Sequence, residues 1–250
     1  MIKTASSIDD VITSLQEIIE REISSNSPLA YFPALYRLVT IRVKQGIGNR
    51  EFADSARMEK LDVLFANRYI EAYLARRNKK PHTGSWRIVF EAEKKPLLIL
   101  QHLLLGMNAH INLDLGIAAA ETGKGKELTL LHNDFNTINR LLFEMTDKVQ
   151  SRIGEVSPLL GLLDRLAGNS DTLLVNFSLS EARDGAWKSA GEFHTSTNNA
   201  NLLTSRDKKI SALGLALIYP NSRWVRGVVS AIRMAESKNV RKVVEQIVSG

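Results

Sequence analysis

Hydrophobic positions recur along most of the chain at the spacing of α-helices. The first example follows Ser7, where Val11, Leu15 and Ile18 fall on one face of a helix. Ser7 and Asp10, three residues apart, resemble a capping box, so this helix is predicted to cover about residues 8–24. Segments in which Val, Ile and Thr alternate with polar residues, as they do in strands, are hard to find.

The same periodicity and its interruptions predict helices over the rest of the chain. Proline near a helix start and glycine near its end set several boundaries, as at Pro33 and Gly46. A short segment at about 85–94 leads to a central helix near 96–120. We therefore predict an all-α fold, a single domain over residues 1–250 with roughly ten helices. The other helices are predicted at about 33–44, 50–78, 133–152, 157–167, 178–195, 198–218, 222–236 and 238–248.

The central segment differs in composition from the rest of the chain. From Pro96 to Ala120 there is no Lys, Arg or Glu, and Asp114 is the single acid. Because the segment is apolar on nearly all sides, it is predicted to be a buried helix. Its length would also span a bilayer, but polar residues such as Asn108 and Asp114 would then lie in the hydrocarbon. We interpret it as protein core and predict no transmembrane segment.

The amino-acid composition excludes several kinds of functional site and argues against others. The chain has no cysteine, which excludes disulfides, thiolate metal sites and a cysteine nucleophile. The first residues contain no apolar signal core, so a cytoplasmic location is predicted. A net charge of +6 permits binding to nucleic acid or anionic lipid, but the basic residues are scattered among 27 acids. Nucleic-acid binding is therefore not expected, because nucleic-acid binders usually concentrate their positive charge.

His110 and Asp114 are the first candidates for chemistry. Their spacing of four residues places imidazole and carboxylate side by side on one face of a helix. A buried carboxylate needs a partner, which could be His110, an arginine or a metal ion. Three interpretations stay open at this point: a pair of metal ligands, a catalytic His-Asp pair and a structural hydrogen bond.

A second cluster, His132 and Asp134, lies at the start of the next long helix. If the two helices bring these faces together, His110, Asp114, His132 and Asp134 form a ligand set suited to zinc, manganese or iron. Asp134 also has a simpler explanation as an acid that caps a helix or lies in its first turn.

The predicted helix at about 50–78 supplies the opposite charges. Arg57 or Arg68 could neutralise Asp114 through a salt bridge, which would explain the buried aspartate without a metal. Asp62 and Glu59 on the same helix are candidates for a catalytic base. The sequence contains no HExxH, paired ExxH or GxSxG motif, so several familiar hydrolytic and di-iron sites are excluded.

Three segments carry a resemblance to known families: Arg57–Tyr69, Met107–Leu115 and Asp134–Asn139. Together they resemble a bacterial family of all-helical proteins of unknown function with a HINxDL signature, over about residues 34–190. The resemblance implies the fold and the importance of these segments, and it assigns no reaction. The HxxxD spacing is also similar to that of zinc-dependent phospholipase C, but the further HxxxH or HxxxE ligand pair of that family is absent. This absence argues against a three-zinc site.

Three functional hypotheses follow, each with a small-molecule substrate or ligand. The first is a metal-dependent helical hydrolase, in which His110 and Asp114 bind the ion and His132 or Asp134 completes the site. Arg57, Arg68 and Asp62 would then contribute to catalysis. The second is a non-catalytic helical module that binds an apolar small molecule or a partner helix. The third is a metal-free biosynthetic enzyme in which Asp114 orients His110 as general base.

Overall fold

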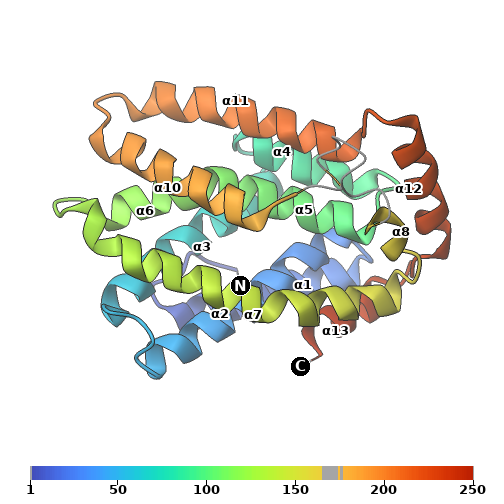
Figure 1. Ribbon diagram of the computed structural model, residues 1–250, viewed down its shortest axis with the longest axis horizontal. Coiled ribbons are helices and arrows are strands. Elements are labelled where there is room, and N and C mark those ends of the chain that lie inside the picture. Colours follow the sequence, from blue (N-terminus) through green and yellow to red (C-terminus); the bar gives the residue numbers. More distant parts are fainter. Residues whose placement is uncertain (1, 165–173, 175–176, 250) are drawn as a thin grey trace.

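The computed structural model describes residues 2–164, 174 and 177–249, and the elements that they form are helical (Figure 1). The predicted all-α fold class is confirmed. Residues 165–167 of the helix predicted at 157–167 lie outside the described residues, and the side chain of Asn139 is not described. The N-terminal half contains α1 (Ile8–Ser24), α2 (Tyr31–Gly48), α3 (Ser55–Arg77), α4 (Gly84–Glu91), α5 (Ile99–Ala109) and α6 (Gly116–Thr122). The C-terminal half contains α7 (His132–Val156), α8 (Gly161–Asp164), α10 (Leu179–Thr195), α11 (Asn199–Ile218), α12 (Arg223–Ala235) and α13 (Val240–Val248).

Side-chain caps explain where the first helices begin. Asp10 N donates to Ser7 Oγ (3.2 Å), and α1 covers the residues that the sequence predicts. The long helix α3 begins five residues later than its predicted start at 50. Asp54 accepts a hydrogen bond from Arg57 N (2.9 Å) and caps this helix, whereas Arg50 has a left-handed backbone (φ 58°) that ends the preceding turn.

The central helix is interrupted by a single π-helical turn, η3 (His110–Leu115), between α5 and α6. The predicted central helix near 96–120 is present over Ile99–Thr122, and the π-turn within it was not predicted. The Asn112 carbonyl in the turn accepts a hydrogen bond from Arg206 Nε of α11 (3.0 Å), which compensates for the altered backbone pairing. By length and composition the run Ile99–Thr122 could cross a membrane, but 83% of its most apolar window is buried inside the protein.

Other helices surround this central run on several sides. α2, α4 and α11 pack against α5, whereas α3 and α10 pack against the π-turn and α6 (Figure 1). Two glycines permit the closest approaches. A Cβ atom at Gly106 would lie 2.3 Å from Phe32 of α2, and one at Gly116 would lie 2.0 Å from Ser189 Oγ of α10. Because neither glycine has a side chain, α2 and α10 can pack closely against the central run.

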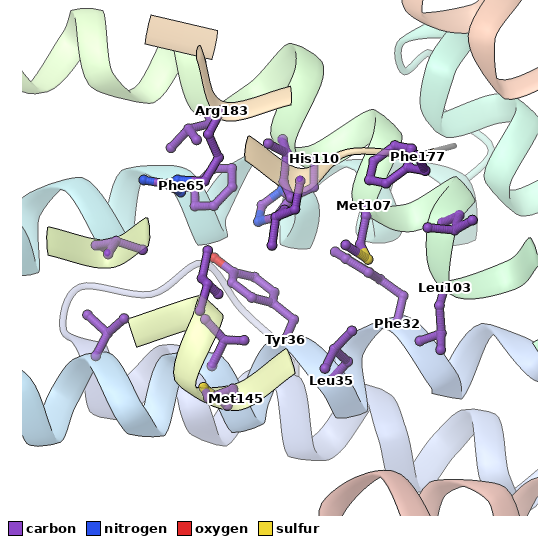
Figure 2. Close-up of a pocket in the computed structure, with 18 of the residues that line it drawn as sticks. Phe32, Leu35, Tyr36, Phe65, Leu103, Met107, His110, Met145, Phe177 and Arg183 are labelled. Atoms are coloured by element: carbon purple, nitrogen blue, oxygen red, sulfur yellow. The ribbon is translucent and has the colours of Figure 1, made fainter. Parts of the chain in front are cut away.

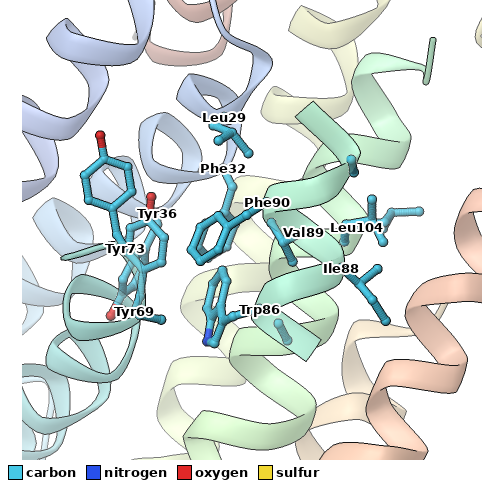
Figure 3. Close-up of a cluster of buried hydrophobic side chains, with 14 of the residues drawn as sticks. Leu29, Phe32, Tyr36, Tyr69, Tyr73, Trp86, Ile88, Val89, Phe90 and Leu104 are labelled. Carbon is cyan, nitrogen blue, oxygen red and sulfur yellow. The ribbon is translucent and has the colours of Figure 1, made fainter. Parts of the chain in front are cut away.

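An aromatic cluster forms the part of the core beside the π-turn (Figure 3). The ring of Phe32 lies 5.2 Å from that of Tyr69 and 5.8 Å from that of Trp86, and the Tyr69 and Trp86 rings are 5.0 Å apart. All three side chains are buried. Edge-on and tilted ring contacts of this kind hold side chains in fixed orientations. The three rings also contact the ring of His110, so His110 packs against side chains that are held in place.

Candidate functional site

A cavity of about 350 Å³ lies beside the central run, and most of the side chains that line it are apolar (Figure 2). Its volume falls in the range typical of small-molecule sites. Phe32 and Leu35 of α2, Phe65 of α3 and Leu103 and Met107 of α5 are among the lining residues. Polar side chains also reach the cavity, and they gather where α2 and α3 meet the π-turn: Tyr36, Asp62 and His110.

His110, the first residue of the π-turn, is one of the residues that line this cavity. Its Nδ1 atom lies 3.5 Å from Asp114 Oδ2, whereas Nε2 is buried and has no hydrogen-bond partner. The imidazole stacks on the Phe65 ring, with centroids 3.5 Å apart and planes 9° apart, and the Tyr36 ring is 4.5 Å away. Burial lowers the pKa of His110 below 6.5, so the ring is neutral at neutral pH.

Asp114 obtains its counter-charge from an arginine. Arg68 Nε donates to Asp114 Oδ1 (3.1 Å), and Trp86 Nε1 donates to Asp114 Oδ2 (2.8 Å). The structure thus places Arg68, one of the two predicted arginines, against Asp114. Because an ionised carboxylate only accepts hydrogen bonds, the adjacent Nδ1 of His110 carries the ring hydrogen. The Nε2 atom is therefore a hydrogen-bond acceptor.

Tyr36 and Asp62, which also line the cavity, each have one further unpartnered atom. The hydroxyl of Tyr36 and Oδ2 of Asp62 are buried, and neither has a hydrogen-bond partner. Burial raises the pKa of Tyr36 well above 10, so this hydroxyl keeps its hydrogen and can donate it. Burial, with a smaller contribution from the charge of Glu59, raises the pKa of Asp62 to about 7. Asp62 is therefore partly protonated near neutral pH.

Arg183 of α10 also lines the cavity and brings a positive charge to its wall, and Figure 2 shows its side chain beside Phe65. Its Nη2 atom donates to the carbonyl of Phe135 (2.8 Å), and its guanidinium lies 4.5 Å from the centroid of the Phe135 ring. Burial lowers the pKa of Arg183 to about 9, which leaves the group charged at neutral pH. The contacts with Phe135 of α7 therefore fix the position of the Arg183 side chain in the cavity wall.

Asp134 and Arg57 form a separate site at the start of α3. Asp134 is buried and accepts hydrogen bonds from the backbone nitrogens of Ala53 (2.6 Å) and Asp54 (3.1 Å) and from Arg57 Nη2 (2.9 Å). Asp134 therefore holds the loop before α3, and Arg57 is paired with Asp134. His132 is exposed; its Nε2 lies 3.2 Å from Asn136 Nδ2, and its ring packs near Trp187.

The four predicted metal ligands are thus not gathered in one place. Within residues 2–164, 174 and 177–249, no group of three or more His, Asp or Glu side chains has a geometry that could hold a metal ion. His110 and Asp114 are adjacent, and both oxygens of Asp134 already accept protein hydrogen bonds. Metal binding stays a prediction that neither the fold nor the contacts test.

Sequence reasoning missed Tyr36 and Trp86, which complete the site. Tyr36 lies one helical turn after Phe32, so the two aromatic rings share a face of α2 and both reach His110. That spacing is visible in the sequence and could have identified Tyr36. The contact of Trp86 with Asp114 joins α4 to the π-turn, and no local spacing predicts it.

Comparison with known proteins assigns the chain to a family without a known activity. No curated protein matches the chain, and neither does any solved structure. The predicted similarity to zinc-dependent phospholipase C therefore stays without support. A model described as a family of unknown function (DUF5995) matches residues 8–220, a longer span than the 34–190 expected from the sequence motifs. The chain belongs to this family.

Proposed function

We propose that the protein binds an uncharged apolar small molecule that carries one hydroxyl or carbonyl group. The observation that carries this proposal is that three residues in the lining of one apolar cavity each have a buried polar atom without a hydrogen-bond partner: Tyr36 (Oη), Asp62 (Oδ2) and His110 (Nε2). Leaving a buried polar atom without a partner costs about 1–3 kcal/mol, so three among the lining residues of one cavity call for a ligand that supplies hydrogen bonds.

The chemistry of the wall defines the polar group of this ligand. His110 Nε2 accepts a hydrogen bond, and the hydroxyl of Tyr36 donates one. A ligand hydroxyl can satisfy both atoms at once, because it donates and accepts. The positive charge of the cavity wall comes from Arg183, whereas the neutral imidazole of His110 brings none and Asp62 becomes negative above pH 7. We therefore assign a hydroxyl or carbonyl group, and not a carboxylate, to the part of the ligand beside His110 and Tyr36.

Calorimetric titration with two probes tests the proposal. Octan-1-ol offers an apolar chain and a hydroxyl, whereas butylbenzene has no hydrogen-bonding group. We expect Tyr36→Phe to weaken octan-1-ol binding by about tenfold, the value of one hydrogen bond, and to leave butylbenzene binding unchanged. Leu35→Trp, which fills the cavity, should weaken both probes. Failure of both probes to bind the wild-type protein would reject the proposal.

A second candidate function, proton transfer within the bound molecule, is favoured by the pairing of His110 with Asp114. Asp114 orients the ring and would stabilise an imidazolium, so Nε2 can act as a base. A molecule recovered from the protein by solvent extraction and returned to it in D₂O should then gain deuterium at a C–H position. His110→Gln should abolish this exchange.

The metal-dependent hydrolase is tested separately. Elemental mass spectrometry of the untagged wild-type protein and of His110→Ala measures whether an ion is bound at this residue. About one equivalent of metal in the wild-type protein, lost in His110→Ala, would replace ligand binding by metal chemistry as the leading proposal.

A further inference from the structure

The helix α12 (Arg223–Ala235) exposes apolar side chains where most helices of this protein expose polar ones. Its inner face is buried through Val225 and Ile232. On its outer face, Trp224 is 85% exposed and Met234 is 80% exposed, the two largest values among the large hydrophobic residues given for the described part of the chain. An indole and a thioether left in water in this way mark a surface that another phase or molecule covers.

The residues on the outer side of α12 form two parallel stripes, in which Ala231 and Arg233 are half-buried and the other residues are exposed. Trp224, Gly227, Ala231 and Met234 follow one another at intervals of three, four and three residues, so they share one stripe of the helix. Nothing lies within 4 Å of the position of a Cβ at Gly227, which shows that this stripe is open. The neighbouring stripe contains Arg223, Arg226, Ser230 and Arg233 at the same intervals.

Most of the charged residues in this helix and beside it in the sequence are basic. From Tyr219 to Val244 the chain has six basic residues and one acid, Glu236. Glu236 is buried, where it accepts hydrogen bonds from Ser157 Oγ (2.7 Å) and Ile99 N (3.1 Å), so it does not face outward. Arg223, Arg226 and Lys238 are exposed. The surface is therefore cationic beside an apolar stripe.

We propose that α12 docks on an anionic lipid surface, with Trp224 and Met234 inserted at the level of the headgroups and Arg223 and Arg226 against lipid phosphates. Helices that lie in a membrane interface combine an aromatic or aliphatic stripe with flanking Arg or Lys, as α12 does. Trp is the side chain most suited to the boundary between acyl chains and water. Tyr219, 57% exposed just before α12, would lie at the same boundary.

The inner face of α12 packs over one end of the cavity. Ile232, Val228 and Val229 belong to a hydrophobic cluster with Leu100, Leu160 and Leu163, and these three leucines also line the cavity. Figure 1 shows α12 beside α8 at one end of the molecule. Docking would therefore bring this end of the cavity to the lipid, where an apolar ligand is concentrated. Entry of a ligand from the lipid into the cavity rests on the proposed function, whereas the docking of α12 on lipid does not.

Sedimentation of the full-length protein with vesicles tests the docking. Vesicles of phosphatidylcholine with 30% phosphatidylglycerol are compared with pure phosphatidylcholine vesicles, at about 50 and 500 mM salt, which shortens the Debye length several-fold. We expect binding to the anionic vesicles at low salt and at least a roughly tenfold weaker partition at high salt and on neutral vesicles. Absence of binding to anionic vesicles at low salt would overturn the proposal.

Matched variants identify the face that binds. Arg223→Glu with Arg226→Glu should reduce partition at least roughly tenfold, and Trp224→Ser should reduce it several-fold. Lys124→Glu with Lys126→Glu makes the same change of charge in the loop after α6, and Leu130→Ser removes another exposed apolar side chain; neither should alter partition. Equal losses in the control variants would overturn the assignment to α12.

Two further outcomes separate the alternatives. Concentration-dependent dimers in the absence of vesicles, abolished by Trp224→Ser, would show that a second copy covers this face and would overturn the lipid proposal. Binding to vesicles by a protein that takes up neither octan-1-ol nor butylbenzene would keep the docking surface and reject the proposed ligand site.

Discussion

Asp114 and Asp134 are both buried carboxylates, and each is paired with an arginine of α3 and has a histidine nearby in the sequence. At Asp134 the acceptor atoms are used by Arg57 and by two backbone nitrogens, and the neighbouring His132 points to solvent. At Asp114 the neighbouring His110 is buried and keeps one nitrogen unpartnered. Burial and charge pairing are common to both sites, and Arg57 Nε at Asp134 is also buried without a partner. The site at Asp114 differs because its unpartnered atoms belong to residues that line an apolar cavity.

The largest expected effect is on stability, at Asp134. Asp134→Ala removes the partner of Arg57 and the acceptor for two backbone nitrogens before α3. We expect the free energy of unfolding to fall by about 3–5 kcal/mol, the cost of breaking a buried ion pair from one side. Urea unfolding followed by circular dichroism measures it. A loss below about 1 kcal/mol would show that Asp134 does not hold the loop.

Replacement of Asp62, which lines the cavity, should stabilise the protein, whereas replacement of Asp134 should destabilise it. Its pKa is raised from 3.8 to about 7 by burial, so the folded protein binds its proton more tightly than the unfolded chain does. The stability from this group is therefore fully present below pH 4 and is lost as pH rises toward 7. We expect Asp62→Asn to raise the free energy of unfolding by up to about 4 kcal/mol at pH 8, the equivalent of this pKa shift, and to change it little at pH 4.

Urea titrations of both proteins at several pH values check this prediction. Glu127→Gln, which neutralises an exposed acid, serves as the control and should shift stability by less than about 0.5 kcal/mol at every pH. A wild-type protein that is stabilised relative to Asp62→Asn at pH 8 would mean that Asp62 has a partner as a carboxylate.

Matched Asp→Asn variants sharpen the comparison between the two sites. Asp114→Asn should cost about 1–2 kcal/mol, less than Asp134→Ala, because Arg68 is partly exposed and can be solvated. It also leaves one acceptor oxygen where Arg68, Trp86 and His110 now share two, so Nδ1 of His110 loses its fixed acceptor and octan-1-ol binding should weaken several-fold. Asp134→Asn should leave octan-1-ol binding unchanged. Equal effects of the two variants on binding would remove the distinction.

The smallest effect is expected at His132. Its side chain is exposed and its one polar contact joins it to Asn136 within the same helix. His132→Ala should change the free energy of unfolding by less than about 0.5 kcal/mol and should not change octan-1-ol binding. Elemental analysis of His132→Ala also tests the metal hypothesis. If the wild-type protein contains a bound metal and His132→Ala does not, His132 is a metal ligand.

The fold followed from local patterns wherever a cap and a periodic face agreed. Ser7 and the spacing of Val11 and Leu15 predict α1 correctly. The π-turn was not predicted, because the apolar sequence from Pro96 to Ala120 fits a continuous helix equally well. The turn depends on contacts such as that of Arg206 with the Asn112 carbonyl, and these join residues 94 positions apart.

The candidate site was predicted only in part, for the same reason. The pairing of Asp114 with Arg68 was among the predicted alternatives, and the burial of His110 and its contact with Asp114 followed from its spacing and its apolar surroundings. The choice between Arg57 and Arg68 depended on how α3 packs, which sequence spacing does not define. The separation of His132 and Asp134 from His110 likewise depended on the offset between α7 and the central run.

The π-turn has a consequence for how the family's sequences should vary in length. A π-turn contains one residue more than the α-helical turn it replaces, so deletion of one residue converts it to an α-helical turn without reversing the chain. A relative one residue shorter between His110 and Gly116 would keep α6 seated on Ser189 and would still hold its histidine and aspartate on one helix face, but it would lack the altered turn in which the Asn112 carbonyl accepts from Arg206. The length of this short interval would then sort family members into those that tie α11 to the central run through this carbonyl and those that do not.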